Sequence, residues 1–311
     1  MAIFREFTKL LNLTDTAKAE HPLRARLLRE PDDRRRDCLW ALDAPPLMKD
    51  ALPGLAGLLT EGFCPQGSLA PSRHRRLGLY FEDVVGDILA ASPETGRLYR
   101  NVQCREQGRT LGEFDFLFAA GARWYHLEAA VKFYLCVGDG SALNHFVGPG
   151  LRDRLDIKWQ RLQQHQLLLS RLSAGQETIA PLGISRPDAK LLMQGYLFYR
   201  GGEVPGESLH PAINPGHLRG WWCTRSELAA RPAKSGRRYA LLQKLRWLSP
   251  ARLPLDDTCD LDELRERLGR RDQPAMVVEL ELLGGPDLWG ECGRGFVVPD
   301  PWPEKAAGAS I

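Results

Sequence analysis

The sequence contains no pair of cysteines at the two-residue spacing of a zinc ribbon or a thioredoxin-like site. Its seven cysteines, an odd number, stand far apart, at positions 38, 64, 104, 136, 223, 259 and 292. A scattered and odd set of thiols is typical of a reducing compartment. We therefore expect free thiols and no disulfide framework.

The chain also lacks a long apolar run and a strong charge of one sign. No segment approaches the roughly 20 apolar residues of a membrane span, and the N-terminal MAIFREFTKLLN carries charges too early for a secretory signal. We therefore expect a soluble, cytoplasmic protein. The net charge of +3 comes from 42 basic and 39 acidic residues, so the total charge does not indicate a nucleic-acid partner.

What is present suggests three parts: an N-terminal helical segment (1–70), a central core (71–200) and a C-terminal α+β lobe (201–311) packed on that core. Apolar residues at helical spacing predict helices, and alternation predicts strands. The expected elements are helices starting near residue 31 and at 74–91, 151–172 and 239–248, a loop at 65–72, and strands at 98–105, 110–119, 123–136, 191–200 and 275–282. This order predicts an α/β (α+β) layer arrangement.

The second and third of these strands carry the chemistry. In GEFDFLF, Phe114, Phe116 and Phe118 are expected on the core face, which turns Asp115 to the other side. A two-residue hairpin at Gly121-Ala122 suits a type II′ turn. That register pairs Ala120 with Arg123 and sets Asp115 opposite Glu128, on one shared face. A one-residue slip would drive Glu128 into the apolar layer.

Two opposed carboxylates repel unless a positive charge lies between them, and a divalent cation is the obvious candidate. Lys132 lies on the same face of the third strand. Oxygen ligands with few histidines suit Mg²⁺ or Mn²⁺ rather than zinc. Glu82, at the edge of the apolar stripe of helix 74–91, can reach a neighbouring site, cap a loop or pair with an arginine.

Basic residues flank the pair in two places and could follow a phosphate backbone. They are Arg73, Arg75 and Arg76 before the first helix, and Arg152, Arg154 and Lys158 along the second. Solvated helix faces are the plainer interpretation, with Asp153 and Asp156 as partners of the second set.

An acidic residue on a helix, then Asp on one strand and Glu with Lys on the next, resembles the PD-(D/E)XK phosphodiesterase superfamily. The segments RLGLYFEDVVGDIL, TLGEFDFLF, HLEAAVKFYL, FVGPGLRDRLDIKWQRLQQHQ and RGFVVPDPWP are similar to a narrower bacterial family, the domain of unknown function 1853 (DUF1853). The narrower resemblance runs from about residue 70 to the C-terminus and implies no activity by itself.

The wider resemblance implies a restriction-endonuclease-like core with a central mixed sheet flanked by helices. It implies a Mg²⁺-dependent (or Mn²⁺-dependent) nuclease that hydrolyses DNA or RNA, and a homodimer as one arrangement, since many such nucleases pair to cut duplexes. Carried over by position, Asp115 matches the metal-binding aspartate, Lys132 the lysine and Glu82 the helix acid.

One position departs from the superfamily pattern. The Glu-x-Lys spacing would place an acid at residue 130, where this chain has Ala130, and Glu128 stands two residues earlier on the same face. Glu128 then supplies the missing ligand through a shifted metal position or through water, or the metal site is impaired. In the second case the protein is a catalytically inactive nuclease-fold module that binds nucleic acid or protein.

Overall fold

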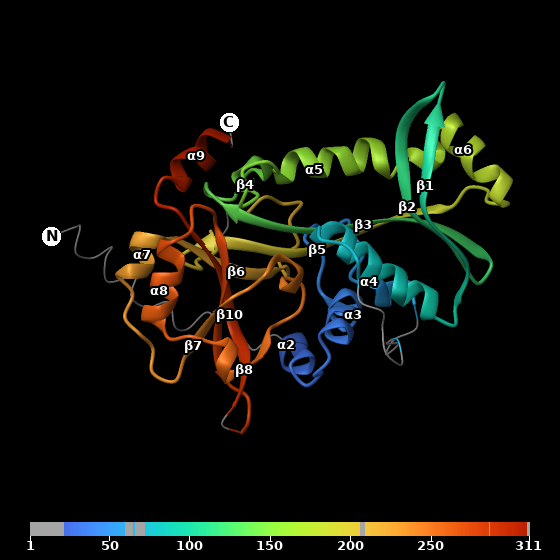
Figure 1. The fold of residues 1–311 in the computed structure, drawn as a ribbon. Coiled ribbons are helices and arrows are strands. Elements are labelled where there is room, and N and C mark those ends of the chain that lie inside the picture. Colours follow the sequence, from blue (N-terminus) through green and yellow to red (C-terminus); the bar gives the residue numbers. More distant parts are fainter. Residues whose placement is uncertain (1–21, 60–64, 66–71, 206–208, 286, 310–311) are drawn as a thin grey trace.

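The structure, a computed structural model, describes residues 22–59, 65, 72–205, 209–285 and 287–309. One mixed sheet of ten strands runs through this part of the chain (Figure 1), in the order β1-β2-β3-β5-β6-β10-β9-β7, with β4 on β3 and β8 on β10. The strands are β1 (Thr95–Glu106), β2 (Arg109–Ala120), β3 (Arg123–Cys136), β4 (Phe146–Val147), β5 (Asp188–Arg200), β6 (Leu218–Thr224), β7 (Arg238–Leu241), β8 (Arg252–Pro254), β9 (Ala275–Leu282) and β10 (Leu288–Val298). The predicted α/β class with a central mixed sheet flanked by helices is confirmed.

The predicted three-strand meander is present as β1, β2 and β3, each antiparallel to the next. Gly121 has φ +59°, the sign that a type II′ turn needs at its first central residue. The register that follows pairs Ala120 with Arg123, as expected. β5 then pairs with β3 in parallel, so the chain crosses over the sheet between these two strands.

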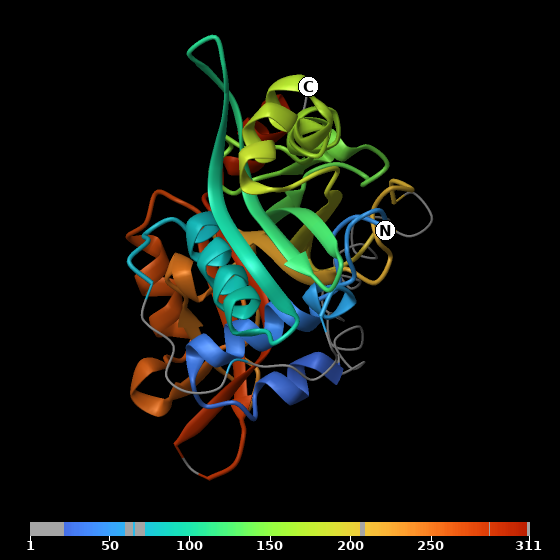
Figure 2. The ribbon, with the colours of Figure 1, turned by 90° about the vertical axis from the view of Figure 1, so that its right-hand side faces the viewer.

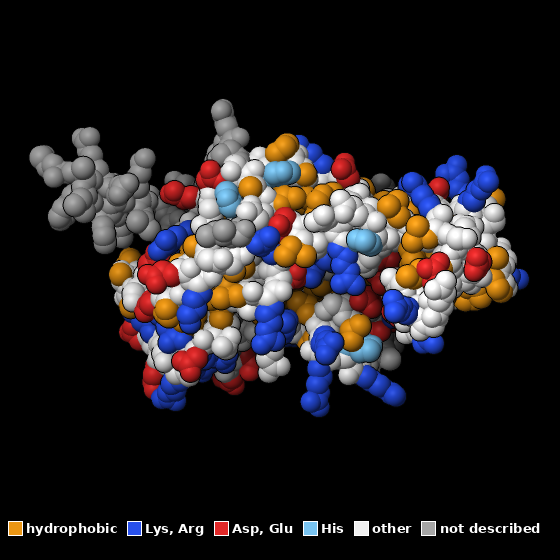
Figure 3. All heavy atoms as spheres, turned by 90° about the horizontal axis from the view of Figure 1, so that it is seen from above, with side chains coloured by type: hydrophobic (Ala, Val, Ile, Leu, Met, Phe, Trp, Pro, Cys, Tyr) orange, Lys and Arg blue, Asp and Glu red, His pale blue; other side chains and the backbone are white. Residues whose placement is uncertain are grey.

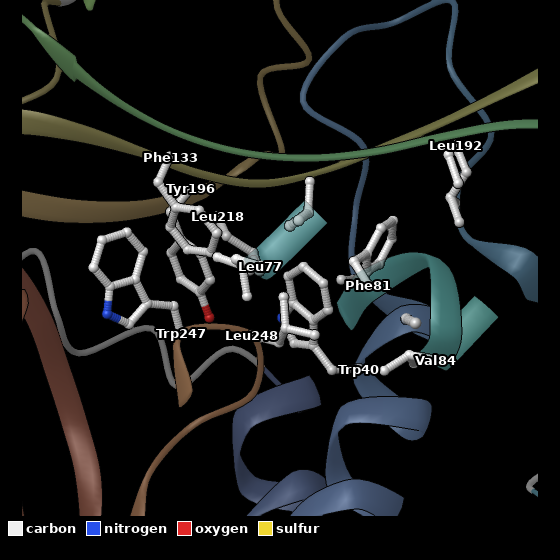
Figure 4. Close-up of a cluster of buried hydrophobic side chains, with 14 of the residues drawn as sticks. Trp40, Leu77, Phe81, Val84, Phe133, Leu192, Tyr196, Leu218, Trp247 and Leu248 are labelled. Atoms are coloured by element: carbon white, nitrogen blue, oxygen red, sulfur yellow. The ribbon is translucent and has the colours of Figure 1, made fainter. Parts of the chain in front are cut away.

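Helices α3 (Asp33–Asp43) and α4 (Leu77–Ala91) cover one face of these strands. The Asp32 side chain caps α3 at the Arg35 N–H, close to the start predicted near residue 31, and the helix ends just before Pro45-Pro46. Trp40 of α3 stacks on Tyr196 of β5 and meets Phe81 of α4 edge-on, as Figure 4 shows. This is the main core, and it confirms the apolar stripe predicted for the helix at 74–91.

The opposite face carries the crossover segment, where one continuous helix at 151–172 was predicted. The prediction is confirmed in outline, because helical backbone runs from residue 155 to 171 as α5 (Leu155–Arg161), the π-turn η3 (Leu162–Gln166) and η4 (Leu169–Arg171). It is wrong in its start and its regularity, and a further helix, α6 (Ser173–Ile179), follows beyond the predicted end. The chain turns between η4 and α6, where a Cβ on Gly175 would lie 1.8 Å from the carbonyl oxygen of Leu169. Folding back in this way lets α6 pack beside the projecting β1–β2 hairpin (Figure 2).

The C-terminal residues extend the same sheet rather than starting another one. β6 pairs in parallel with both β5 and β10, so hydrogen bonding is continuous across the boundary expected at residue 200. The helix predicted at 239–248 is wrong. That stretch forms β7 and the short turn η6 (Lys244–Arg246), because its apolar residues pair with β9. The strand predicted at 275–282 is confirmed as β9.

The remaining helices are short and lie around the C-terminal strands: α2 (Pro22–Leu27), α7 (Arg225–Ala229), α8 (Leu261–Gly269) and α9 (Trp302–Ala309). α9 returns to the crossover segment, where Trp302 Nε1 donates to the Pro149 carbonyl at 2.9 Å and Arg154 donates to the Ala309 carbonyl at 2.8 Å. Within the described ranges, no helix is long and apolar enough to cross a membrane. Most of the loop expected at 65–72 lies outside the described residues, and so does the N-terminal stretch before residue 22.

Candidate functional site

The candidate site lies where β2 separates from β3. The last paired residues are Phe116 and Leu127, and the next position brings Asp115 level with Glu128, as the sequence predicts. Here Oδ2 of Asp115, instead of a backbone carbonyl oxygen, accepts the hydrogen bond from the Ala129 N–H, at 3.0 Å. The site is therefore built into an opening in the sheet rather than onto a loop.

β1 is also irregular beside this opening. Asn101, which lies across from Asp115 in the β1–β2 register, has φ +53°, an uncommon value for a residue with a side chain. Phe114 packs with Leu117 and Leu169 on the crossover face, whereas Phe116 and Phe118 enter the main core. The prediction that all three phenylalanines share one face is thus wrong at Phe114, because the alternation of faces breaks between Phe114 and Phe116, where the pairing of β2 with β3 ends.

The Glu128 carboxylate is fully buried and held from two sides. Its Oε1 lies 2.9 Å from His126 Nε2, and its Oε2 accepts from Gln166 Nε2 at 2.6 Å. Gln166 ends the π-turn, whose wider backbone ring joins Leu167 N to Leu162 O at 3.0 Å. Such turns recur at functional sites because they redirect side chains. This one brings an amide to a buried carboxylate.

The surroundings of Asp115 strongly perturb its carboxyl group. Burial, followed by the negative charge of Glu128, raises its pKa to about 8, against the opposing effect of the Ala129 N–H. Glu82 adds a smaller repulsion from α4. The carboxyl of Asp115 consequently holds a proton at neutral pH unless a cation replaces it.

Glu82 stands at the entrance to the same group of acids. Burial raises its pKa, the Asn101 side chain lowers it by hydrogen bonding, and the charges of Glu113 and Glu128 raise it. Asn101 Nδ2 also donates to Glu113 Oε1 at 3.1 Å. Glu82 lies within electrostatic range of Glu113, Arg100 and Glu128, and its own charge raises the pKa of Asp115.

The two lysines of the site differ in their partners. Lys132 Nζ binds the Asp153 carboxylate, whose other oxygen accepts from Tyr134 at 3.1 Å. Lys158 Nζ donates to Gln166 Oε1 at 3.0 Å and lies close enough to the acids for their charges to act on it. Burial lowers the pKa of Lys158, and so does the charge of Lys132, while Asp115 and Glu128 oppose that decrease.

Gln166 and His126 lie at the site although neither was predicted as a site residue, and Lys158 was predicted only as a basic residue that could follow a phosphate backbone. Each of the three has a signal in the sequence. Lys158 follows Leu155 by three residues, and Gln166 follows Leu162 by four, so both border the apolar stripe that faces the sheet. His126 alternates with Leu127 along β3 and shares the face of Glu128.

Among the described residues, no three or more His, Cys, Asp or Glu side chains converge to hold a metal ion. The chain can therefore offer two close carboxylates, with Glu82 further out. That donor set does not suit zinc, which takes three or four protein ligands. It does suit Mg²⁺, which keeps several waters and needs one or two carboxylates together with substrate phosphates.

The predicted basic flanks are on the surface, in different states. Arg73, Arg75 and Arg76 precede α4 and are exposed, as is Arg152. Arg154 is neutralised by both oxygens of Asp156, at 2.7 and 3.0 Å. Seen from above, Lys and Arg side chains border acidic ones on this face (Figure 3). Arg154 therefore contributes less free positive charge than the sequence suggests.

No curated protein and no solved structure matches the chain significantly. A family model described as "Domain of unknown function (DUF1853)" matches residues 12–298, which include every element that builds the site. The chain therefore belongs to the DUF1853 family.

Proposed function

We propose that this protein is a divalent-metal-dependent phosphodiesterase that hydrolyses DNA or RNA. One observation carries the proposal: Asp115 and Glu128 are level with each other on adjacent strands, and the charge of Glu128 helps to raise the pKa of Asp115 to about 8. Burying two carboxyl groups side by side is costly when both are charged. A proton on Asp115 offsets this cost in the metal-free protein, and a divalent cation would offset it in the bound state.

Asp115 and Glu128, with Glu82 further out, would hold the ion, and Mg²⁺ or Mn²⁺ fits their oxygen donors. The ion would lower the pKa of a bound water and polarise a phosphate. Each carboxylate oxygen has two lone pairs, so Glu128 can accept from His126 and Gln166 and still offer a ligand. His126 and Gln166 would fix the orientation of that carboxylate.

The arrangement of the strands also supports the wider superfamily. An antiparallel meander, preceded by a helix and followed by a crossover to a parallel strand, is what the PD-(D/E)XK resemblance implies for a restriction-endonuclease-like core. Exposed Arg73, Arg75, Arg76 and Arg152 offer charge to a phosphate backbone. On this view, Ala130 is compensated by Glu128.

Magnesium binding tests the proposal directly. Calorimetric titration with MgCl₂ should show binding to the wild type and its loss in both Asp115→Asn and Glu128→Gln. Asp262→Asn, which changes an exposed carboxylate on α8, is the matched control and should bind as the wild type does. Labelled DNA and RNA oligonucleotides should then be cleaved by the wild type with Mg²⁺ or Mn²⁺ and spared with a chelator. No binding at millimolar metal would contradict metal-dependent hydrolysis.

The second candidate is an inactive nuclease-fold module that binds nucleic acid or protein. Its support is that Glu128 is engaged at both oxygens and Lys132 is neutralised by Asp153. This candidate predicts oligonucleotide binding that weakens steeply with salt and needs no divalent ion. A gel-shift series with and without chelator separates the two functions.

A further inference from the structure

The resemblance assigns the lysine of the site to Lys132, but the structure gives that ammonium group another task. Lys132 Nζ binds Asp153, and Tyr134 donates to the same carboxylate. Asp153 belongs to the loop before α5, which α9 holds through Trp302 and Pro149. The charge of Lys132 is thus already balanced by a partner that the fold keeps in place.

Lys158, in contrast, has no charged partner of this kind among the described residues. It is half-buried on α5, and within the described part of the chain it forms no ion pair. Its one hydrogen bond is to the neutral amide oxygen of Gln166, whose nitrogen binds Glu128 at 2.6 Å. A partly desolvated ammonium without a bound anion attracts one strongly. An ammonium group beside two carboxylates is also correctly placed for a metal-bound phosphate.

The π-turn explains how Gln166 bonds both Glu128 and Lys158, which stands eight positions earlier in the chain. In a regular α-helix eight residues advance about 12 Å. The extra residue in the turn changes the direction of Gln166, so that one side chain joins Lys158 to Glu128. Gln166 therefore restricts the rotamers of Lys158 and holds its ammonium group within electrostatic range of Asp115 and Glu128.

We infer that Lys158, rather than Lys132, contacts the phosphate that is hydrolysed, with Gln166 as its positioning residue. The inference rests on the proposed phosphodiesterase function and names the cationic group of that site. In the reaction, a water oxygen bonds to phosphorus while losing a proton to solvent. The bridging P–O bond breaks, its electron pair goes to the departing oxygen, and that oxygen takes a proton from solvent. Lys158 would stabilise the charge on a non-bridging oxygen.

Three single substitutions in the full-length protein test this assignment: Lys158→Met, Lys132→Met and Lys158→Arg. Methionine removes the charge at similar length, and arginine keeps a charge. The measurements are kcat and KM for a labelled oligonucleotide with Mg²⁺, together with Mg²⁺ affinity by calorimetry. Lys158→Met should lower kcat by about 100-fold, the usual effect of removing one charge-stabilising donor. Lys158→Arg should recover part of that loss.

Magnesium affinity separates a phosphate contact from a structural role. Lys158 is a positive charge near Asp115 and Glu128, so its removal should leave Mg²⁺ binding unchanged or tighter. If Lys158→Met only loosened the fold, Mg²⁺ affinity and kcat would fall together, and that result would overturn the inference. The inference would also be overturned if Lys132→Met lost about 100-fold in kcat while Lys158→Met stayed near the wild type. In that case the proposed function would still stand. A wild type that neither binds Mg²⁺ nor cleaves any oligonucleotide would overturn both.

Discussion

At the scale of single residues, the most informative group is Asp115. Its pKa is raised to about 8 by burial and by Glu128, so below that pH the ordinary occupant of its carboxyl is a proton. A metal ion must displace this proton before it can bind. The position of this carboxyl group beside Glu128 was predictable from strand alternation, but its protonation state was not, because that state depends on side chains from other strands and helices.

We expect Mg²⁺ affinity to rise with pH. Each unit of pH below 8 should lower the apparent affinity by up to about tenfold, since one proton is released per ion bound. Above pH 8 the affinity should level off. Calorimetry in buffers of different ionisation enthalpy would count the released protons. An affinity that does not change between pH 6 and pH 8 would contradict the assignment of Asp115 as a ligand.

The metal-free protein should show the opposite trend in stability. The folded pKa of Asp115 lies above its usual value of 3.8, so the native state binds the proton more tightly than the unfolded state. This contribution is present in full at low pH and is lost as pH rises to 8, at up to about 1.4 kcal/mol per pH unit. Asp115→Asn should flatten this part of the curve in urea unfolding from pH 5 to 9. If the unfolding free energy of the variant keeps the same dependence on pH, the titrating group is a residue other than Asp115.

Gln166 also has a measurable effect on stability. Gln166→Leu removes the Nε2 donor from Glu128 and leaves His126 as its side-chain partner. Loss of a donor to a buried charged group should lower the free energy of unfolding by about 1–3 kcal/mol. Gln164→Leu is the matched control, because Gln164 is exposed on the same turn and bonds only Gln160. Equal effects of the two substitutions in urea unfolding would argue against a structural bond to Glu128.

At the scale of elements, the meander and α4 were predictable because each has one strong apolar face. The crossover helix was predictable in outline from the helical spacing of Leu155, Trp159 and Leu162, but its π-turn and the reversal before α6 were not. Periodicity cannot show an inserted residue or a reversal of direction, and the segment contains both, at the π-turn and before α6. The same limit explains 239–248, where pairing with β9 overrides a helical pattern.

Two glycines make the reversal testable. Gly175→Ala should destabilise the protein by several kcal/mol, since its Cβ would overlap the Leu169 carbonyl oxygen and push α6 away. Gly78→Ala, on the first turn of α4, has open space and should be neutral or stabilising by up to about 1 kcal/mol. Thermal unfolding of the two variants gives the comparison. Similar midpoints would mean that α6 can move without cost.

At the scale of the whole molecule, the C-terminal strands are joined to the core by buried charge as well as by the sheet. Arg294 of β10 binds Glu291 through Nε and Nη2, donates to carbonyls at 247–249 and lies 4.3 Å over the ring of Tyr196 in β5. No local pattern in the sequence predicts this link, because its partners come from three separate segments. The division of the chain expected at residue 200 also gave no indication of this link.

Breaking this link from one side should be costly. Arg294→Met leaves Glu291 buried without its charged partner, which we expect to lower the free energy of unfolding by about 3–5 kcal/mol. The double variant Arg294→Met/Glu291→Met should recover much of that loss, because no uncompensated charge remains. Urea unfolding of both variants measures the difference. A double variant as unstable as the single one would show that packing, and not charge, links the strands.

The attachment of α9 has a practical consequence. Trp302 and Arg154 tie the end of the chain to the loop that carries Asp153, and Asp153 sets the position of Lys132. A purification tag fused after the last residue would disturb these contacts between α9 and the loop. Activity assays on such a preparation would compare Lys132 and Lys158 in surroundings that the tag has changed. The tag should therefore be fused at the N-terminus or cleaved before activity is measured.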